Sequence, residues 1–124
     1  MNHIVSLIDI PVYSDHRGQV VSIEFSHLPF IPQRFFTTTG NKPGVIRGQH
    51  GHFLCEQILF SLRGEISVLV QTAQISETYL LHPTAKALYV PSGVWASQTF
   101  QKGTEILGCL ASHSYDPNDL FQQI

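Results

Sequence analysis

The most informative stretch of this chain is Arg47-Gly48-Gln49-His50-Gly51-His52. Residues two apart on a β-strand point to the same face of the sheet, so a strand here would place the His50 and His52 imidazoles side by side. The ordinary pKa of histidine is near neutrality, so such a pair facing a cavity can exchange protons with a substrate or hold a metal ion. An isolated pair of this kind is more often solvated than functional, so a functional site is indicated only if the surrounding sequence supports it.

The rest of the chain has the periodicity of short strands. Runs rich in β-branched, aromatic and other apolar residues alternate with turn-forming segments, and no stretch has a sustained 3.6-residue period. The runs that predict strands span residues 4–10, 19–25, 34–39, 56–62, 65–71, 77–82, 87–90, 94–100 and 104–111. About nine or ten short strands predict an all-β jelly-roll sandwich or barrel that closes around a pocket.

Composition limits the classes of protein to which the chain can belong. Its 124 residues suffice for one hydrophobic core, so we expect a single domain spanning residues 1–124. The formal net charge is −2 and 13% of the residues are charged, which argues against nucleic acid as a partner. This low charge beside 43% hydrophobic residues predicts a surface covered by a second subunit, in a homodimer.

The sequence contains no signal for a membrane or for an oxidising compartment. No apolar run approaches the ~18 residues that span a bilayer, and Met1-Asn2-His3-Ile4 does not start a signal peptide, so we expect a cytoplasmic protein with no membrane partner. Cys55 and Cys109 lie far apart, each within an apolar run. We expect two buried free thiols without a redox role.

The spacing around the histidine pair resembles the cupin superfamily. Residues of the first cupin motif stand at the usual intervals, as Gly44, His50-x-His52, Glu56 and Gly64. The second motif is present as Pro91-Ser92-Gly93 followed by Val94-Trp95. In metal-binding cupins this second motif continues to a histidine, where the chain has Ala96. Two histidines and a glutamate can still bind zinc or iron, but the lost ligand weakens the site, so we expect no catalytic metal.

A longer ordered set of residues resembles the sugar 3,4-ketoisomerases, the WxcM-like cupins that isomerise dTDP-4-keto-6-deoxyglucose to the 3-keto sugar. The similarity runs from about Ile8 to Phe121 and includes Asp15-His16-Arg17-Gly18, Glu24, Leu28-Pro29-Phe30, Arg34-Phe35-Phe36, Arg47-Gly48-x-His50-x-His52, Glu56-Gln57, Gly64, Leu88-Tyr89-Val90, Val94-Trp95, Leu110-Ala111-Ser112 and Tyr115-Asp116-x-x-Asp119. The resemblance implies a homodimeric isomerase without metal or cofactor, which supplies deoxy-amino sugars for surface polysaccharides or glycosylated products.

The chemistry of such an enzyme explains the histidine pair. Moving a ketone from carbon 4 to carbon 3 needs a base that removes the carbon 3 proton, and a donor to the oxygen that gains charge in the enediol. The resemblance points to His50 as the base. It leaves His52 to move protons between the sugar oxygens or to orient the sugar.

Five further residues are candidates for binding the nucleotide sugar. Guanidinium groups match phosphate geometry, so Arg47 is a candidate for holding a sugar or diphosphate oxygen, and Arg17 is a second candidate for the diphosphate. The resemblance adds Arg34, Glu56 and Trp95. Strand alternation places Arg47 opposite to the histidines, so it reaches the pocket only if residues 44–48 form a loop or bulge.

Each of these candidates has a simpler alternative. Arg17 can be a solvated turn residue, Glu56 can hydrogen-bond a histidine, and Trp95 can pack in the core or a dimer interface.

Three departures from the family pattern keep two other functions open. Family members commonly carry tyrosines at Phe35 and Phe36, a histidine at Ala96, and Asp-Tyr where this chain has Asp119-Leu120. The missing hydroxyls favour a non-catalytic cupin that binds a nucleotide sugar or small carbohydrate. The remaining histidines and Glu56 favour a small metal-dependent cupin such as a dioxygenase.

Overall fold

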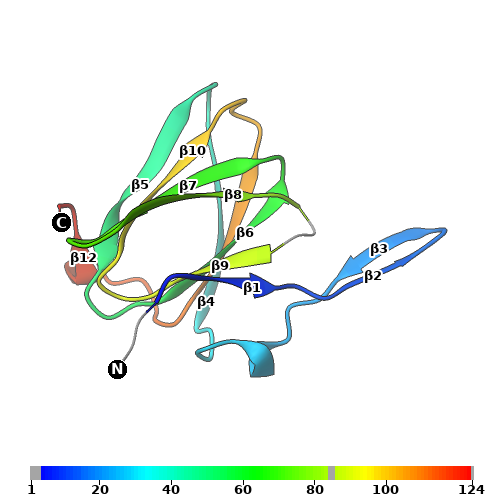
Figure 1. Cartoon of the computed structure of the whole chain (residues 1–124), viewed down its shortest axis with the longest axis horizontal. Coiled ribbons are helices and arrows are strands. Elements are labelled where there is room, and N and C mark those ends of the chain that lie inside the picture. Colours follow the sequence, from blue (N-terminus) through cyan, green and yellow to red (C-terminus); the bar gives the residue numbers. More distant parts are fainter. Residues whose placement is uncertain (1–3, 84–85, 124) are drawn as a thin grey trace.

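The computed structural model describes residues 4–83 and 86–123, and the regular elements in this part of the chain are nearly all strands (Figure 1). The strands are β1 (Ser6–Asp9), β2 (Val12–Asp15), β3 (Gly18–Val21), β4 (Arg34–Thr39), β5 (Val45–His52), β6 (Gln57–Arg63), β7 (Ile66–Gln71), β8 (Ser76–Leu81), β9 (Lys86–Val90), β10 (Trp95–Phe100), β11 (Ile106–Ala111) and β12 (Leu120–Phe121). Two 3-10 helices, η1 (Phe25–His27) and η2 (Pro117–Asp119), complete the described elements. The predicted all-β class is confirmed.

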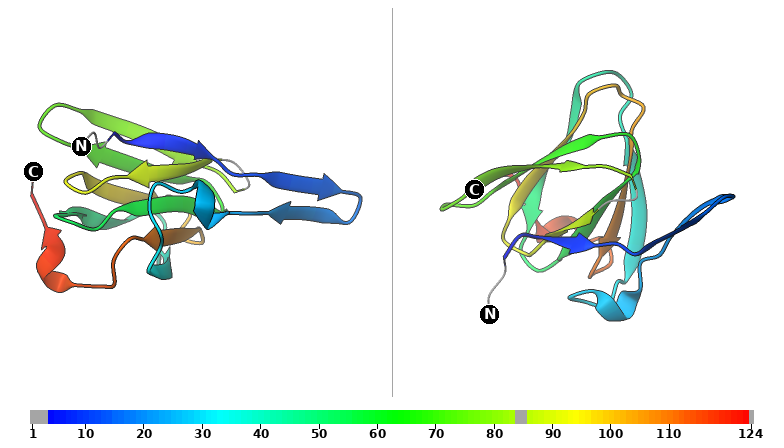
Figure 2. Two further views of the ribbon diagram at one scale, coloured as in Figure 1. Left: turned by 90° about the horizontal axis from the view of Figure 1, so that it is seen from below. Right: turned by 45° about the vertical axis from the view of Figure 1, so that its right-hand side comes forward.

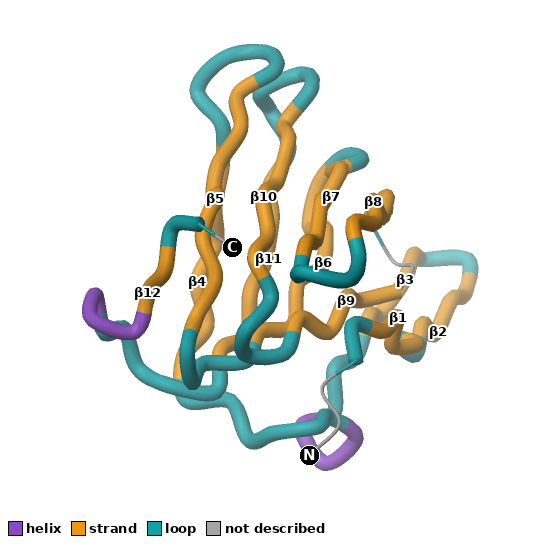
Figure 3. The backbone as a smooth tube through the Cα atoms, turned by 60° about the vertical axis from the view of Figure 1, so that its left-hand side comes forward, coloured by secondary structure: helices purple, strands orange, loops and turns teal. Residues whose placement is uncertain are grey.

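Two five-stranded antiparallel sheets form the body of the molecule. One has the strand order β1-β9-β6-β11-β4 and the other the order β12-β5-β10-β7-β8. Apart from the consecutive strands β7 and β8, neighbours in each sheet are not consecutive in the sequence, as expected for a jelly roll. Figure 3 shows β5 beside β10, with the short β12 along the opposite edge of β5. This arrangement brings the end of the chain next to the histidine strand.

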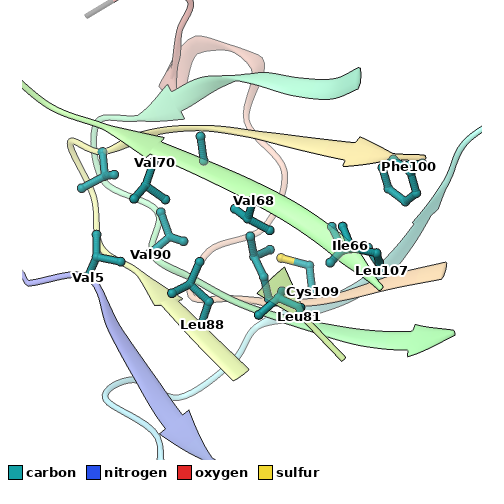
Figure 4. Close-up of a cluster of buried hydrophobic side chains, with 13 residues drawn as sticks. Val5, Ile66, Val68, Val70, Leu81, Leu88, Val90, Phe100, Leu107 and Cys109 are labelled. Atoms are coloured by element: carbon teal, nitrogen blue, oxygen red, sulfur yellow. The ribbon is translucent and has the colours of Figure 1, made fainter. Parts of the chain in front are cut away.

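The core lies between the two sheets and follows the period of two that the sequence predicts. In β7 the side chains alternate between buried and half-buried, and Ile66, Val68 and Val70 are fully buried. They pack against Leu88 and Cys109 of the facing sheet (Figure 4). Each fully buried aliphatic side chain stabilises the fold by ~1.5–3 kcal/mol. Cys109 and Cys55 are both buried and free, as predicted.

The strand bounds differ from the prediction in the N-terminal part of the chain. The run at residues 19–25 predicts one strand, but β3 ends at Val21 and η1 begins at Phe25. The sequence pattern predicts no strand at β2, because only its first two residues are apolar. β2 forms by pairing with β3 across a turn in which the Asp15 carboxylate accepts a hydrogen bond of 2.8 Å from the Arg17 amide. The resulting hairpin projects from the body of the molecule (Figure 2).

The outer face of the sheet containing β6 carries a second hydrophobic cluster, which is made by Ile58, Phe60, Ala87, Tyr89 and Leu110. Ile23, Leu28 and Phe30, from the segment that follows β3, pack against part of it. Phe35 and Leu62 at its margin are 55% and 49% exposed. Among the described residues, the structure shows no helix with the length and apolarity that a membrane span requires.

Candidate active site

A β-bulge in β5 shapes the candidate site. Gly48 and Gln49 have φ angles of +80° and +62°, and the pairing with β10 skips from Ala96↔His50 to Ser97↔Gly48. Gln49 is therefore an extra residue without a partner on β10, which is the definition of a bulge. The extra residue changes the alternation along the strand, so that Arg47 lines the same cavity as His50. The bulge that Arg47 requires is present.

The His50 and His52 rings lie together at the end of β5. Their centroids are 5.1 Å apart and their planes are nearly perpendicular, at 87°. The backbone beside them is fixed, because the Gly93 amide of the second motif donates a 2.7 Å hydrogen bond to the His52 carbonyl oxygen. The first motif thus supplies the expected pair of adjacent imidazoles, and Gly93 of the second motif holds the backbone of His52 in place.

Both imidazoles have a pKa below the ordinary histidine value. Burial lowers the pKa of His50, and burial also makes the largest contribution to lowering the pKa of His52. The His50 and Arg34 charges lower the pKa of His52 further, while the Asp119 carboxylate raises it. Nδ1 of His50 is buried without a hydrogen-bond partner among the described residues. A depressed pKa keeps each ring largely neutral near pH 7, and a neutral imidazole can accept a proton.

The histidines line a cavity of about 390 Å³ between the two sheets. That volume is within the range of small-molecule sites. Its lining combines polar and apolar side chains, from Arg34, Phe36, Thr37, Thr38, Arg47, Gly48, His50, His52, Gln57, Leu59, Gln98, Leu107, Tyr115 and Leu120. Residues from both sheets and from the C-terminal segment thus surround the pair.

Two arginines give the cavity a positive charge. The Arg34 guanidinium lies 4.2 Å from the centre of the Phe36 ring and 5.2 Å from that of Tyr115, so it is held between two aromatic rings. Arg47 donates a weak 3.4 Å hydrogen bond to the Thr39 carbonyl oxygen. Neither arginine forms an ion pair with another described residue. Both guanidiniums remain available to an anionic ligand.

Three of the predicted site residues do not line this cavity. Arg17 is at the tip of the β2–β3 hairpin, where its 78% exposed side chain forms an ion pair of 2.6 Å with Asp15. The Glu56 carboxylate accepts a hydrogen bond from the Tyr89 hydroxyl, so its partner is a tyrosine rather than a histidine. Trp95 donates a 2.9 Å hydrogen bond from its indole nitrogen to the Gln122 carbonyl oxygen.

The donor set around the histidines does not fit a metal ion. Ala96 is opposite His50 on the neighbouring strand and offers no ligand atom. Glu56, the third ligand of the cupin motif, is bound to Tyr89 outside the cavity. Within residues 4–83 and 86–123, no group of three or more His, Cys, Asp or Glu side chains is placed to share a metal. A structural or catalytic metal site requires three or four protein ligands.

Several polar residues of the cavity are not among the predicted site residues. Gln98 is only 8% exposed, is paired with Arg47 across the strands, and lines the cavity. A signal for it existed, because Gln98 stands on the same strand face as the buried Ala96 and Phe100, where a polar side chain is unusual. Tyr115 belongs to a motif of the ketoisomerases, but it was not assigned a role.

Comparison with known proteins gives concordant results. The family described as "FdtA: WxcM-like, C-terminal" matches residues 3–124. The TDP-4-oxo-6-deoxy-alpha-D-glucose-3,4-oxoisomerase of Aneurinibacillus thermoaerophilus is 34% identical over 113 residues, which cover 88% of this chain and 79% of that protein.

Solved structures agree in fold. QdtA, a sugar 3,4-ketoisomerase from Thermoanaerobacterium thermosaccharolyticum solved in complex with TDP, superposes with a TM-score of 0.88 at 26% identity, covering 96% of this chain and 88% of that one. A histidine-to-asparagine variant of QdtA, solved with TDP-4-keto-6-deoxyglucose, superposes with a TM-score of 0.90 at 26% identity, covering 99% and 90%.

Proposed function

The chain belongs to the FdtA, WxcM-like family, and from this premise we propose that it is a 3,4-ketoisomerase of a dTDP-linked 4-keto-6-deoxyhexose. The observation that carries the proposal is the pair of imidazoles, 5.1 Å apart, in a cavity lined by two arginines. The similar 3,4-oxoisomerase of Aneurinibacillus thermoaerophilus and QdtA act on, or bind, TDP-linked molecules of this class.

In the proposed reaction the two histidines divide the proton transfers. His50 removes the proton from carbon 3, the electrons of that bond form the carbon 3–carbon 4 double bond, and the carbon 4 oxygen takes a proton. The enediol then loses the proton of the carbon 3 hydroxyl, a ketone forms at carbon 3, and carbon 4 receives a proton. His52 donates to and accepts from the two oxygens. Its orientation perpendicular to His50 supports a separate target for each ring.

The two arginines of the cavity are proposed to bind the anionic part of the substrate. Guanidinium groups form paired hydrogen bonds with phosphate oxygens, and neither Arg34 nor Arg47 has a carboxylate partner among the described residues. Arg34 is prepositioned by the rings of Phe36 and Tyr115. Arg17, Glu56 and Trp95 stay weaker candidates, because in one chain they are outside the cavity.

The protein is proposed to work as a homodimer. Phe35 and Leu62 on the outer face of one sheet, and Tyr13 and Val20 on the projecting hairpin, are each about half exposed or more. A surface with this much apolar area and little charge is commonly covered by a partner, and a second copy is the partner that the low charge predicts. In a dimer, the hairpin of one copy is the element able to carry Arg17 toward the other copy. Sedimentation at micromolar concentration tests this, and a monomer would contradict it.

The cellular role is proposed from the family alone. An isomerase of this kind supplies a 3-keto sugar for amination, in the synthesis of deoxy-amino sugars for surface polysaccharide. Such a role belongs in the cytoplasm. Deletion of the gene followed by analysis of surface sugars would test the role, and an unchanged sugar composition would contradict it.

A non-catalytic nucleotide-sugar-binding protein is the second candidate, favoured by the absence of family tyrosines at Phe35 and Phe36. Only Phe36 lines the cavity, because Phe35 stacks on Phe60 on the outer face of its sheet. At most one cavity hydroxyl is therefore lost at these two positions, which weakens this alternative.

The discriminating experiment measures binding and turnover with the same ligands. The protein is incubated with a panel of dTDP-linked and UDP-linked 4-keto sugars, and 3-keto products are followed by NMR. Conversion of a dTDP-linked sugar supports the isomerase. Micromolar binding of dTDP without turnover of any sugar would support the binding protein and refute the isomerase.

A further inference from the structure

Asp119 is a buried carboxylate to which the reaction above assigns no role. It ends η2 and is only 9% exposed. One carboxylate oxygen accepts a hydrogen bond of 2.8 Å from the Leu54 amide, and the other accepts one of 3.0 Å from the Cys55 amide. Its carbonyl oxygen accepts a third, of 2.9 Å, from the Phe53 amide. Asp119 thus accepts hydrogen bonds from the three consecutive residues that follow His52.

The same residue lies beside the His52 side chain. Leu120, the next residue after Asp119, pairs with His52 in the ladder between β12 and β5. Asp119, His52 and Arg34 also line a second cavity of only about 10 Å³. A void of this size is about the smallest that holds one water molecule. Asp119 and His52 thus lie on the wall of the same small cavity.

Groups of both positive and negative charge act on the pKa of His52. His50 on the same strand and Arg34 on β4 both disfavour a proton on His52, and burial does so most strongly. Asp119 favours that proton. His113 and Asp116 also line the small cavity. For His50 the cause of the lowered pKa is burial, with no carboxylate acting against it.

We propose that Asp119 is a positioning residue for His52, because it fixes the turn after this histidine and so holds the imidazole in the cavity beside His50. Amide hydrogen bonds from Leu54 and Cys55 fix the carboxylate in place. The pairing of Leu120 with His52 fixes the backbone of this histidine relative to Asp119. This inference rests on the proposed function for its consequence in turnover, but not for its geometry.

The test compares Asp119→Asn with Asp116→Asn. Asp116 is on the same segment, and its side chain accepts a hydrogen bond from the Asn118 amide, so the control removes the same charge nearby. The pKa values of both active-site histidines are measured by NMR titration in each variant. We expect Asp119→Asn to lower the pKa of His52 more than that of His50, and Asp116→Asn to change neither ring comparably. Equal effects of the two variants on His52 would overturn the inference.

Turnover provides a second readout where a substrate is found. We expect Asp119→Asn to reduce kcat about 10-fold and to leave KM within about twofold, and Asp116→Asn to change neither comparably. An equal loss of kcat in the two variants, or a loss that appears only in KM, would contradict the inference. The NMR titration needs no substrate, so its outcome stands even if no keto sugar is converted.

The unmodified protein gives a third measurement in case Asp119→Asn does not fold. The 13Cγ chemical shift of Asp119 should change as His52 titrates, with an inflection at the pKa of that imidazole. The Asp116 signal is the control. An Asp119 signal that does not respond to the titration of His52 would overturn the inference.

Discussion

Replacement of Gly48 by alanine is the sharpest test of how the backbone forms the cavity. Gly48 has φ of +80°, and a Cβ atom there would lie 2.7 Å from Gln98 Oε1 and 3.1 Å from the Ala96 carbonyl oxygen. The side-chain amide can move, but the carbonyl oxygen belongs to the neighbouring strand. Relief of both contacts requires the bulge to shift against β10.

Gly44 provides a matched control for this substitution. It has the same φ of +80°, but a Cβ there would have no atom within 4 Å. Both alanine variants therefore carry the cost of a left-handed backbone, ~1–2 kcal/mol. Only Gly48→Ala adds the overlap, and overpacking of this kind costs ~1–3 kcal/mol. The difference in the free energy of unfolding between the two variants therefore measures the overlap alone, because both carry the same backbone cost.

The assay is urea unfolding of both variants, together with kcat/KM. We expect Gly48→Ala to have a free energy of unfolding ~1–3 kcal/mol below that of Gly44→Ala. A shifted bulge also turns Arg47 away from the cavity, so kcat/KM should fall about 10-fold or more only in Gly48→Ala. If the two variants are equally stable and equally active, the bulge does not position Arg47 and the reasoning is refuted.

Three other predictions concern stability and metal dependence. Tyr89→Phe should lower the free energy of unfolding, measured in denaturant, by ~1–3 kcal/mol, because the Glu56 carboxylate loses its hydrogen-bond donor. Turnover should stay nearly unchanged, because the pair lies outside the cavity, and a large loss of turnover would contradict that position. Burial lowers the pKa of both active-site histidines from 6.5, so the unfolded chain binds more protons than the folded chain in mild acid. The free energy of unfolding, measured in urea, should therefore fall as the pH drops below 6.5. The fall should be smaller in His50→Asn, which has lost one of the two imidazoles. Chelator treatment should leave turnover intact, and restoration of lost activity by zinc or iron would refute this.

The sequence was sufficient for the fold class because the strand signals are local. In β7, Ile66, Val68 and Val70 alternate with half-buried residues, and this period of two predicts a strand without knowledge of the surrounding structure. β12 has no such signal, since it is two residues long and exists only because Leu120 pairs with His52. Pairing between distant segments leaves little trace in a short stretch of sequence.

The site was predictable where a motif fixed it and not where tertiary packing did. His50 and His52 share a face by strand alternation, and the bulge required for Arg47 follows from the same rule. Glu56 stands at the motif spacing of a ligand, yet its carboxylate is bound by Tyr89 from another strand. Gln98 and Asp119 come close to the histidines through the pairing of β10 and β12 with β5, which the sequence alone does not predict.

The central claim is that His50 acts as the base of a 3,4-ketoisomerase, and hydrogen exchange with solvent tests it most directly. A dTDP-linked 4-keto-6-deoxy sugar is incubated in D₂O with the wild-type protein, with His50→Asn, and with the control variant His82→Asn. His82 is a half-exposed residue whose imidazole lies 3.3 Å from the Glu65 carboxylate. NMR should show the 3-keto product, with deuterium at carbon 4, for the wild type and His82→Asn. For His50→Asn the rate should be ~100- to 10,000-fold lower, with sugar binding retained. Turnover by His50→Asn at the wild-type rate would contradict the account.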